Sequence, residues 1–144
     1  MRVILLVPAA LVAAGVATLA AQQHDSVPPV PAPTALAAGV FSDSQATVGE
    51  SVYRNECGRC HLIADHSGAD FQANWNGRTV RSLFDYLRST MPDDDPGALS
   101  DDEYLAAIAY ILRVNGMPSG QAALTTDTTV LGKARIDIKW PRQP

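Results

Sequence analysis

From residue 42 onward the chain carries three stretches in which apolar residues recur at helical spacing. The first stretch is Asp43 to Cys57, and its apolar face is formed by Ala46, Val52, Tyr53 and Cys57. The second begins after Thr79, a side chain suited to cap a helix, and ends at Met91-Pro92, because proline disfavours helical backbone in the residue before it. Its apolar face is formed by Val80, Leu83, Phe84 and Leu87.

The third stretch carries the clearest helix signals. Ser100 and Glu103 have the spacing of a capping box, and Gly116 suits the left-handed turn that ends many helices. The apolar positions between them are Tyr104, Leu105, Ile108, Ala109 and Leu112. These signals predict a helix over Asp101 to Asn115. Only residues 134–140 alternate as a strand would, and briefly, so we expect an all-α domain with about three main helices.

The N-terminal part of the chain has a different character. Met1-Arg2 precede an apolar run from Val3 to Ala21 that ends in small residues, which is the pattern of a secretory signal peptide. An uncleaved membrane anchor is the alternative, because about 19 apolar residues nearly suffice to span a bilayer. The next segment is rich in proline and alanine and predicts an extended linker. The expected organisation is a leader at 1–21, a linker at 22–41, a folded domain at 42–120 and a C-terminal extension at 121–144.

Composition narrows the classes of function. The chain has 144 residues, with 11 Lys and Arg against 15 Asp and Glu, and this net charge of -4 argues against nucleic acid as a partner. Aromatic residues make up only 6%, and so small a core usually needs a disulfide, a metal or a cofactor to be stable. The two cysteines, Cys57 and Cys60, lie three residues apart, which indicates that both belong to one local chemical site.

Both cysteines belong to the motif Cys57-Gly58-Arg59-Cys60-His61, the signature of covalent haem attachment. On one helical turn this spacing brings two thiols and an imidazole to the same side, so that both sulfurs can reach haem vinyl groups while His61 reaches the iron. A redox dithiol is the first alternative, but it usually follows a strand in a βαβ unit, which the pattern lacks. A zinc site is the second, and it would need further Cys or His ligands at suitable spacing.

An electron-transfer haem also needs a sixth iron ligand. Met91 is the first candidate, because Pro92 holds the chain extended where the second helix ends and lets the thioether point inward. Met117 has a similar setting before Pro118, with packing in the core as its alternative role. His66 is five residues from His61 and is expected on a surface loop, and His24 lies in the linker.

Three more side chains are candidates for contact with the haem propionates. The indole N–H of Trp75 can donate to a propionate while the ring covers the haem edge, although ordinary core filling explains this residue equally well. Arg78 and Arg81 can neutralise propionates, but solvation on a helix face is the commoner fate of arginine.

Several segments around the motif resemble a single-haem class I cytochrome c domain of the kind attached to or partnered with periplasmic quinoprotein and molybdenum dehydrogenases. The segments that carry the resemblance are Tyr53-Arg54-Asn55-Glu56, Leu83-Phe84-Asp85-Tyr86 before Thr90-Met91-Pro92, Pro96-Gly97-Ala98-Leu99-Ser100, and Ala109-Tyr110-Ile111-Leu112 before Asn115-Gly116. The resemblance implies a small class I cytochrome c fold around one covalently attached haem c, with Met91 as distal ligand and the first and third helices crossing behind the haem.

Relatives commonly place a proline soon after the haem motif. The loop that contains this proline supplies a carbonyl that accepts a hydrogen bond from the N–H of the axial imidazole. This chain has no proline between Cys57 and Met91, so the resemblance does not set the partner of His61.

The expected function is that of a periplasmic electron carrier, not an enzyme, in which a His/Met-ligated haem passes single electrons between a dehydrogenase and a respiratory acceptor such as an oxidase or another cytochrome. The sequence also leaves open that the chain is the cytochrome subunit of a dehydrogenase. A haem enzyme or gas sensor is the main alternative and would need an open sixth site. A membrane-tethered structural subunit, whose haem mainly holds the fold, is a further alternative.

The acidic residues are unevenly distributed. Six of them fall between residues 93 and 103, with no Lys or Arg among them: Asp93, Asp94, Asp95, Asp101, Asp102 and Glu103. Beside the Met91 loop such a rim would steer a basic redox partner to the haem edge. Acidic side chains that complement a helix N-terminus explain the last three as well.

Overall fold

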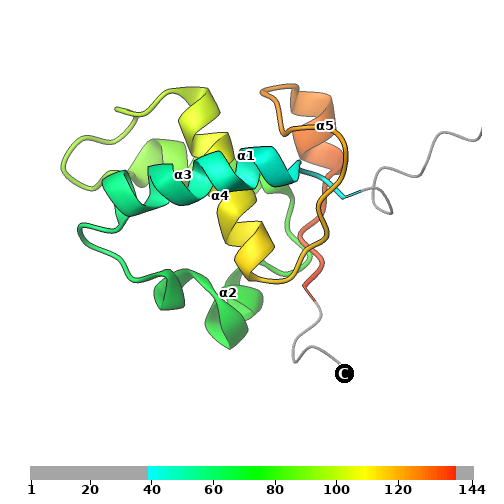
Figure 1. The fold of residues 1–144 in the computed structure, drawn as a ribbon, viewed down its shortest axis with the longest axis horizontal. Helices are drawn as coiled ribbons and strands as arrows, with labels where there is room; N and C mark the ends of the chain where they lie inside the picture. The colour runs from blue at the N-terminus through cyan, green and yellow to red at the C-terminus, as the bar shows by residue number, and fades with distance from the viewer. Residues whose placement is uncertain (1–38, 139–144) are drawn as a thin grey trace, which may run out of the picture. The chain divides into compact units, whose positions relative to one another are not determined.

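The computed structural model describes residues 39–138 and contains five α-helices in this range (Figure 1). Their bounds are α1 Asp43–Val52, α2 Gly68–Trp75, α3 Val80–Thr90, α4 Asp101–Val114 and α5 Thr128–Lys133. A π-helical turn, Tyr53–Cys57, and a 3-10 turn, Ile63–His66, complete the regular structure. No β-strand forms within residues 39–138, so the expected all-α class is confirmed.

The predicted leader at 1–21, nearly all of the predicted linker, and His24 lie outside the described residues. The same holds for the last two positions of the strand-like stretch, 139 and 140. Within residues 39–138, no helix is both long enough and apolar enough to cross a membrane.

Helices α3 and α4 begin at the residues that the sequence predicts. The Thr79 hydroxyl accepts a hydrogen bond from the Ser82 amide at 3.1 Å, which caps α3. At α4 the capping box is complete, because Ser100 accepts from the Glu103 amide while the Glu103 carboxylate accepts from the Ser100 amide at 2.8 Å. The hydrogen bonds from Ser100 also hold the pKa of Glu103 below its usual range.

The first predicted helix is not continuous. Regular α-helix ends at Val52, and the next five residues form a π-helical turn, closed by a hydrogen bond of 2.7 Å from the Gly58 amide to the Tyr53 carbonyl. Over five residues, an α-helix and a π turn place apolar side chains at similar spacing, so the sequence pattern did not distinguish between them. The wider π turn ends at Cys57, which is the first residue of the haem motif.

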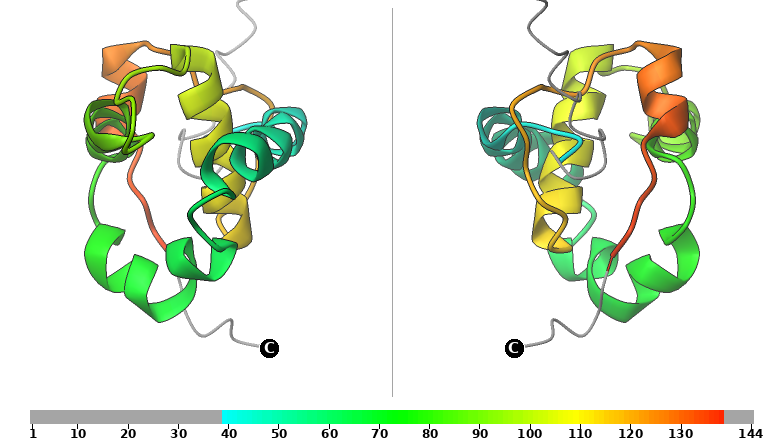
Figure 2. Two further views of the ribbon diagram at one scale, coloured as in Figure 1. Left: turned by 90° about the vertical axis from the view of Figure 1, so that its left-hand side faces the viewer. Right: turned by 90° about the vertical axis from the view of Figure 1, so that its right-hand side faces the viewer.

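Helix α4 is the central element of the domain. Eight of its fourteen residues are buried, and α1 runs across it (Figures 1 and 2). At the crossing the two backbones nearly touch, because a Cβ added at Gly49 of α1 would lie 1.8 Å from the carbonyl oxygen of Ala106. Only glycine permits this approach, so Gly49 sets how α1 lies on α4.

Residues 134–138 lie along the segment that joins α2 to α3, and Figure 2 shows them running from α5 towards α2. The Gly77 amide donates to the Ile136 carbonyl at 2.8 Å, and the Ile136 amide donates to the Arg78 carbonyl at 2.9 Å. Alternate side chains of this segment are buried: Ala134, Ile136 and Ile138. The predicted alternation of buried and exposed side chains is therefore present. However, this segment pairs with the connection between α2 and α3 through one isolated bridge, Thr79 with Arg135, and forms no strand among the described residues.

We expect Gly49→Ala to lower the free energy of unfolding by about 1–3 kcal/mol, because the methyl group forces α1 away from α4. Urea unfolding of the haem-loaded protein measures this. The matched control is Gly132→Ala in α5, where an added Cβ meets nothing within 4 Å. There the substitution should raise stability by about 0.5–1 kcal/mol, since alanine loses less backbone entropy than glycine in a helix. Equal stability of the two variants would contradict the role of Gly49.

Candidate functional site

One cavity of about 420 Å³ lies among the π turn, α2, α3 and α4. Its walls contain all five side chains that the sequence singles out as site residues: Cys57, Cys60, His61, Trp75 and Met91. Most of the remaining lining is apolar or aromatic, including Phe71, Leu83, Leu87, Leu99, Tyr104 and Ile111. Its volume falls in the range of ligand pockets, roughly 300–1,000 Å³.

The two cysteines and His61 are held by one tight turn. The Cys57 carbonyl accepts hydrogen bonds from the Cys60 amide at 3.1 Å and from the His61 amide at 2.9 Å. These two bonds place both sulfurs and the imidazole on the wall of the same cavity. Gly58 is needed in this turn, because a Cβ there would lie 2.7 Å from the Arg54 carbonyl oxygen.

The environment of the thiols distinguishes between two of the candidate chemistries. Cys57 is half-buried, and burial raises the pKa of its thiol, with a smaller contribution from the Glu56 carboxylate. Reactive dithiols have a lowered thiol pKa, because the thiolate is the nucleophile. The environment of Cys57 therefore argues against a redox dithiol.

Met91 is held in place through its backbone. Its amide donates to the Leu87 carbonyl at 2.8 Å and thereby ends α3. Its carbonyl accepts from the hydroxyl of the buried Tyr104 at 2.6 Å and from the Gly97 amide at 3.3 Å. Three hydrogen bonds thus fix the backbone from which the Met91 thioether enters the cavity.

The other candidates for an iron ligand are placed differently. Met117 is buried in the hydrophobic core and does not line the cavity. His66 does line it, and its ring lies against that of His61, with 4.8 Å between the ring centroids and 80° between the planes. The expectation of a surface-loop histidine is therefore wrong.

His66 is half-buried because polar groups hold both its ring and its backbone. Its Nδ1 forms a hydrogen bond of 2.8 Å with the Tyr53 hydroxyl, and its carbonyl accepts from Asn115 Nδ2 at 2.9 Å. Burial lowers the pKa of His66, and the neighbouring His61 lowers it further. These partners are 13 and 49 residues away in sequence, so no local signal marked His66.

Trp75 closes one side of the cavity within an aromatic group. The centroid of its ring lies 6.3 Å from the ring centroid of Phe71 and 5.4 Å from that of Tyr86. The guanidinium carbon of Arg78 lies 5.2 Å from the centroid of the Trp75 ring. It is only partly buried, and its indole N–H has no hydrogen-bond partner among residues 39–138. The ring therefore fills space at the cavity wall.

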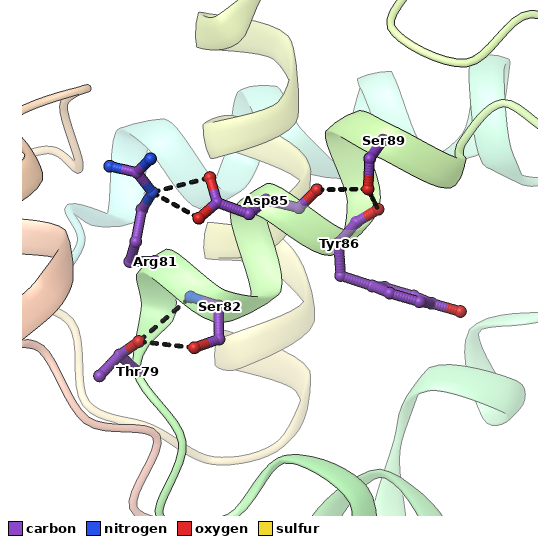
Figure 3. Close-up of polar contacts among 6 residues, drawn as sticks. All are labelled: Thr79, Arg81, Ser82, Asp85, Tyr86 and Ser89. Atoms are coloured by element: carbon purple, nitrogen blue, oxygen red, sulfur yellow. Dashed lines mark hydrogen bonds and ion pairs between the residues drawn. The ribbon is translucent and has the colours of Figure 1, made fainter.

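The two arginines considered for propionates lie elsewhere. The Arg81 Nε reaches both carboxylate oxygens of Asp85, at 2.6 and 2.7 Å, one turn further along α3 (Figure 3). Neither Arg81 nor Arg78 lines the cavity. Among the described lining residues, Arg59 of the haem motif is the one Lys or Arg side chain.

Acidic side chains border the cavity beside Met91. Asp93 and Asp94 are part of its lining, and both are exposed. Further along, Asp101 pairs with Arg88 of α3 at 2.8 Å, so it is not free to meet a partner as Asp93 and Asp94 are. The rim next to the Met91 loop is therefore negatively charged.

Residues 44–111 match the family model described as cytochrome c oxidase, cbb3-type, subunit III. The match supports a class I c-type cytochrome domain in this segment. Domains of this kind bind a covalently attached haem c, and the match supports a role in haem-based electron transfer. Domains of this class are generally electron carriers rather than enzymes and pass electrons to partner proteins. No curated protein and no solved structure matches the chain.

The residues that line the cavity fit haem c in donor chemistry and in shape. Covalent attachment needs two thiols on one turn, and axial ligation needs an imidazole beside them, which Cys57, Cys60 and His61 provide. The cavity walls are mainly apolar, as a porphyrin ring requires. Met91, a residue with a thioether side chain, lines the same cavity at the end of α3.

We expect Tyr104→Phe to lower the free energy of unfolding by about 1 kcal/mol, because the Met91 carbonyl loses one of its two donors. Hydrogen exchange at the Gly97 amide, which donates to the same carbonyl, should become faster. Tyr86→Phe is the control, since Tyr86 also lines the cavity but its hydroxyl is exposed. Unchanged Gly97 exchange in Tyr104→Phe would show that Tyr104 does not hold the Met91 loop.

Proposed function

We propose that this protein is an exported, single-electron carrier whose haem c is attached through Cys57 and Cys60 and held between His61 and Met91. The observation that carries the proposal is the meeting of four side chains from two separate segments on the walls of one largely apolar cavity. Cys57 and Cys60 would each form one thioether, because the sulfur and the proton of a thiol can add across one haem vinyl group without releasing a co-product. His61 follows Cys60 directly, so attachment also fixes the axial imidazole.

Two protein ligands make electron transfer the favoured chemistry. Haem c, when bound, supplies an iron that changes between the ferrous and ferric states. With His61 on one side and Met91 on the other, no coordination position is left open for a substrate or a gas. The Met91 thioether is neutral and favours the ferrous state, and the apolar walls disfavour the additional charge of the ferric state. Together they support a carrier of relatively high reduction potential.

A haem enzyme or gas sensor is less well supported. It would require Met91 to be absent from the iron and an acid or base to stand over the open side. His66 is the additional imidazole in the cavity, but it lies against His61 and forms a hydrogen bond with Tyr53. Its position beside the axial histidine suits support of that ligand better than proton transfer to a bound molecule.

The partners that we propose are a donor dehydrogenase and an acceptor oxidase or cytochrome in the periplasm. The family that residues 44–111 match is described as an oxidase subunit, which supports an oxidase on the acceptor side. The leader at 1–21 supports export, with a membrane tether if it is retained. The acidic rim at Asp93 and Asp94 favours a basic face on the partner.

Replacement of either cysteine tests the attachment. We expect Cys57→Ala or Cys60→Ala to leave little haem bound after denaturation and acid extraction, because each thiol supplies one of the two thioether bonds. Haem absorbance that migrates with the denatured polypeptide is the measurement. If the denatured wild-type protein released all of its haem, the attachment by these cysteines would be refuted.

Paired methionine variants test the sixth ligand. Met91→Leu should abolish the weak red absorption band of methionine bound to ferric iron, lower the reduction potential and let cyanide bind readily. Met117→Leu should keep the band, because Met117 packs in the core and the substitution nearly conserves its volume. Loss of the band in Met117→Leu, with its retention in Met91→Leu, would reverse the ligand assignment.

A further inference from the structure

We propose that His66, held in one orientation by Tyr53, is the positioning residue of His61 and sets the electron donation of that ligand. The proposal rests on the proposed function, since it takes His61 as an axial ligand. It assigns a role to two residues of the cavity wall that the attachment and the sixth ligand leave unused.

The first observation concerns Tyr53. Its hydroxyl lies 3.1 Å from the Leu62 carbonyl oxygen and 2.8 Å from His66 Nδ1. A hydroxyl has one proton, and a carbonyl oxygen can only accept. With both bonds formed, Tyr53 donates to Leu62 and its oxygen accepts from a proton on Nδ1 of His66.

This hydrogen-bond pattern fixes the tautomer of His66. With the proton on Nδ1, the neutral ring keeps an unprotonated Nε2 that can only accept. Burial raises the pKa of Tyr53 to about 12, so the hydroxyl remains a donor throughout the physiological range.

The second observation is the contact between the two imidazoles. The rings of His61 and His66 meet edge to face, with centroids 4.8 Å apart. A ligating histidine keeps a proton on its other ring nitrogen and usually donates it to a fixed acceptor. Among the described residues, no carbonyl or carboxylate accepts a hydrogen bond from the His61 ring, and the aromatic ring that lies against it is that of His66.

His66 is itself anchored to the core. Asn115, only 5% exposed at the end of α4, donates to the His66 carbonyl at 2.9 Å and accepts from the Gly68 amide at 3.0 Å. Tyr53 is 4% exposed and packs on Tyr110 of α4, with 5.6 Å between the ring centroids. Both partners of His66 are thus fixed by the same buried helix, so the ring presents a constant face to His61.

The consequence is a measurable effect on the iron. An acceptor beside an axial imidazole makes that ligand more basic and stabilises the ferric state. Removal of His66 should therefore raise the reduction potential, in the opposite direction to loss of Met91. We expect a shift of about tenfold in the ferric to ferrous equilibrium, which corresponds to about 59 mV for a one-electron couple.

The test compares holoprotein variants that all carry covalent haem. The reduction potential should rise in His66→Phe and, to a smaller extent, in Tyr53→Phe, where the ring is kept but its tautomer is released. Tyr110→Phe is the matched control, because Tyr110 packs on Tyr53 without a bond to His66, and its potential should equal that of the wild type. Equal potentials in Tyr53→Phe, Tyr110→Phe and the wild type would overturn the proposal even if His66→Phe failed to fold.

A second readout needs no substitution. In the diamagnetic ferrous protein, ¹⁵N chemical shifts distinguish a protonated from an unprotonated ring nitrogen, and His66 should show a protonated Nδ1 and an unprotonated Nε2. A proton on Nε2 would overturn the proposal. Failure of the proposed function would appear separately, as absence of the methionine–iron band or of covalent haem in the wild-type sample.

Discussion

The contact between the backbones of Gly49 in α1 and Ala106 in α4 is the constraint on which the site depends. A side chain at Gly49 would push the two helices apart, so their close crossing requires glycine at this position. Helix α1 leads directly into the π turn that carries Tyr53 and Cys57. The position of the haem motif, and the packing of Tyr53 on Tyr110, therefore follow from how closely α1 can lie on α4.

Helix α4 also organises two segments of the cavity wall, one near each of its ends. Tyr104 in its first turn donates to the Met91 carbonyl, and Asn115 at its C-terminus donates to the carbonyl of His66. Both side chains are buried and both act on backbone carbonyls, so they hold segments in place without touching the reactive atoms. One buried helix thus holds both of these segments in place.

Features that depend on a few neighbouring residues could be predicted from the amino-acid sequence. The caps at Thr79 and Ser100 fixed where α3 and α4 begin, since a capping side chain acts on amides within three residues. The spacing of Cys57, Cys60 and His61 fixed their shared side of one turn, and the fold places all three on one cavity. Covalent haem c follows from the same spacing and agrees with the family match over residues 44–111.

Features that rest on distant partners could be seen only in the folded chain. His66 was expected on the surface, but Tyr53 and Asn115, 13 and 49 residues away, hold it against the cavity. Residues 134–138 lie beyond the matched segment, yet they bury Ile136 and hydrogen-bond the connection between α2 and α3. Apolar periodicity reports which face of an element is buried, and it carries no information on which distant element covers that face. For the same reason the sequence singled out the candidate haem-binding residues, but not Tyr104 and Asn115, which hold the backbone around the cavity.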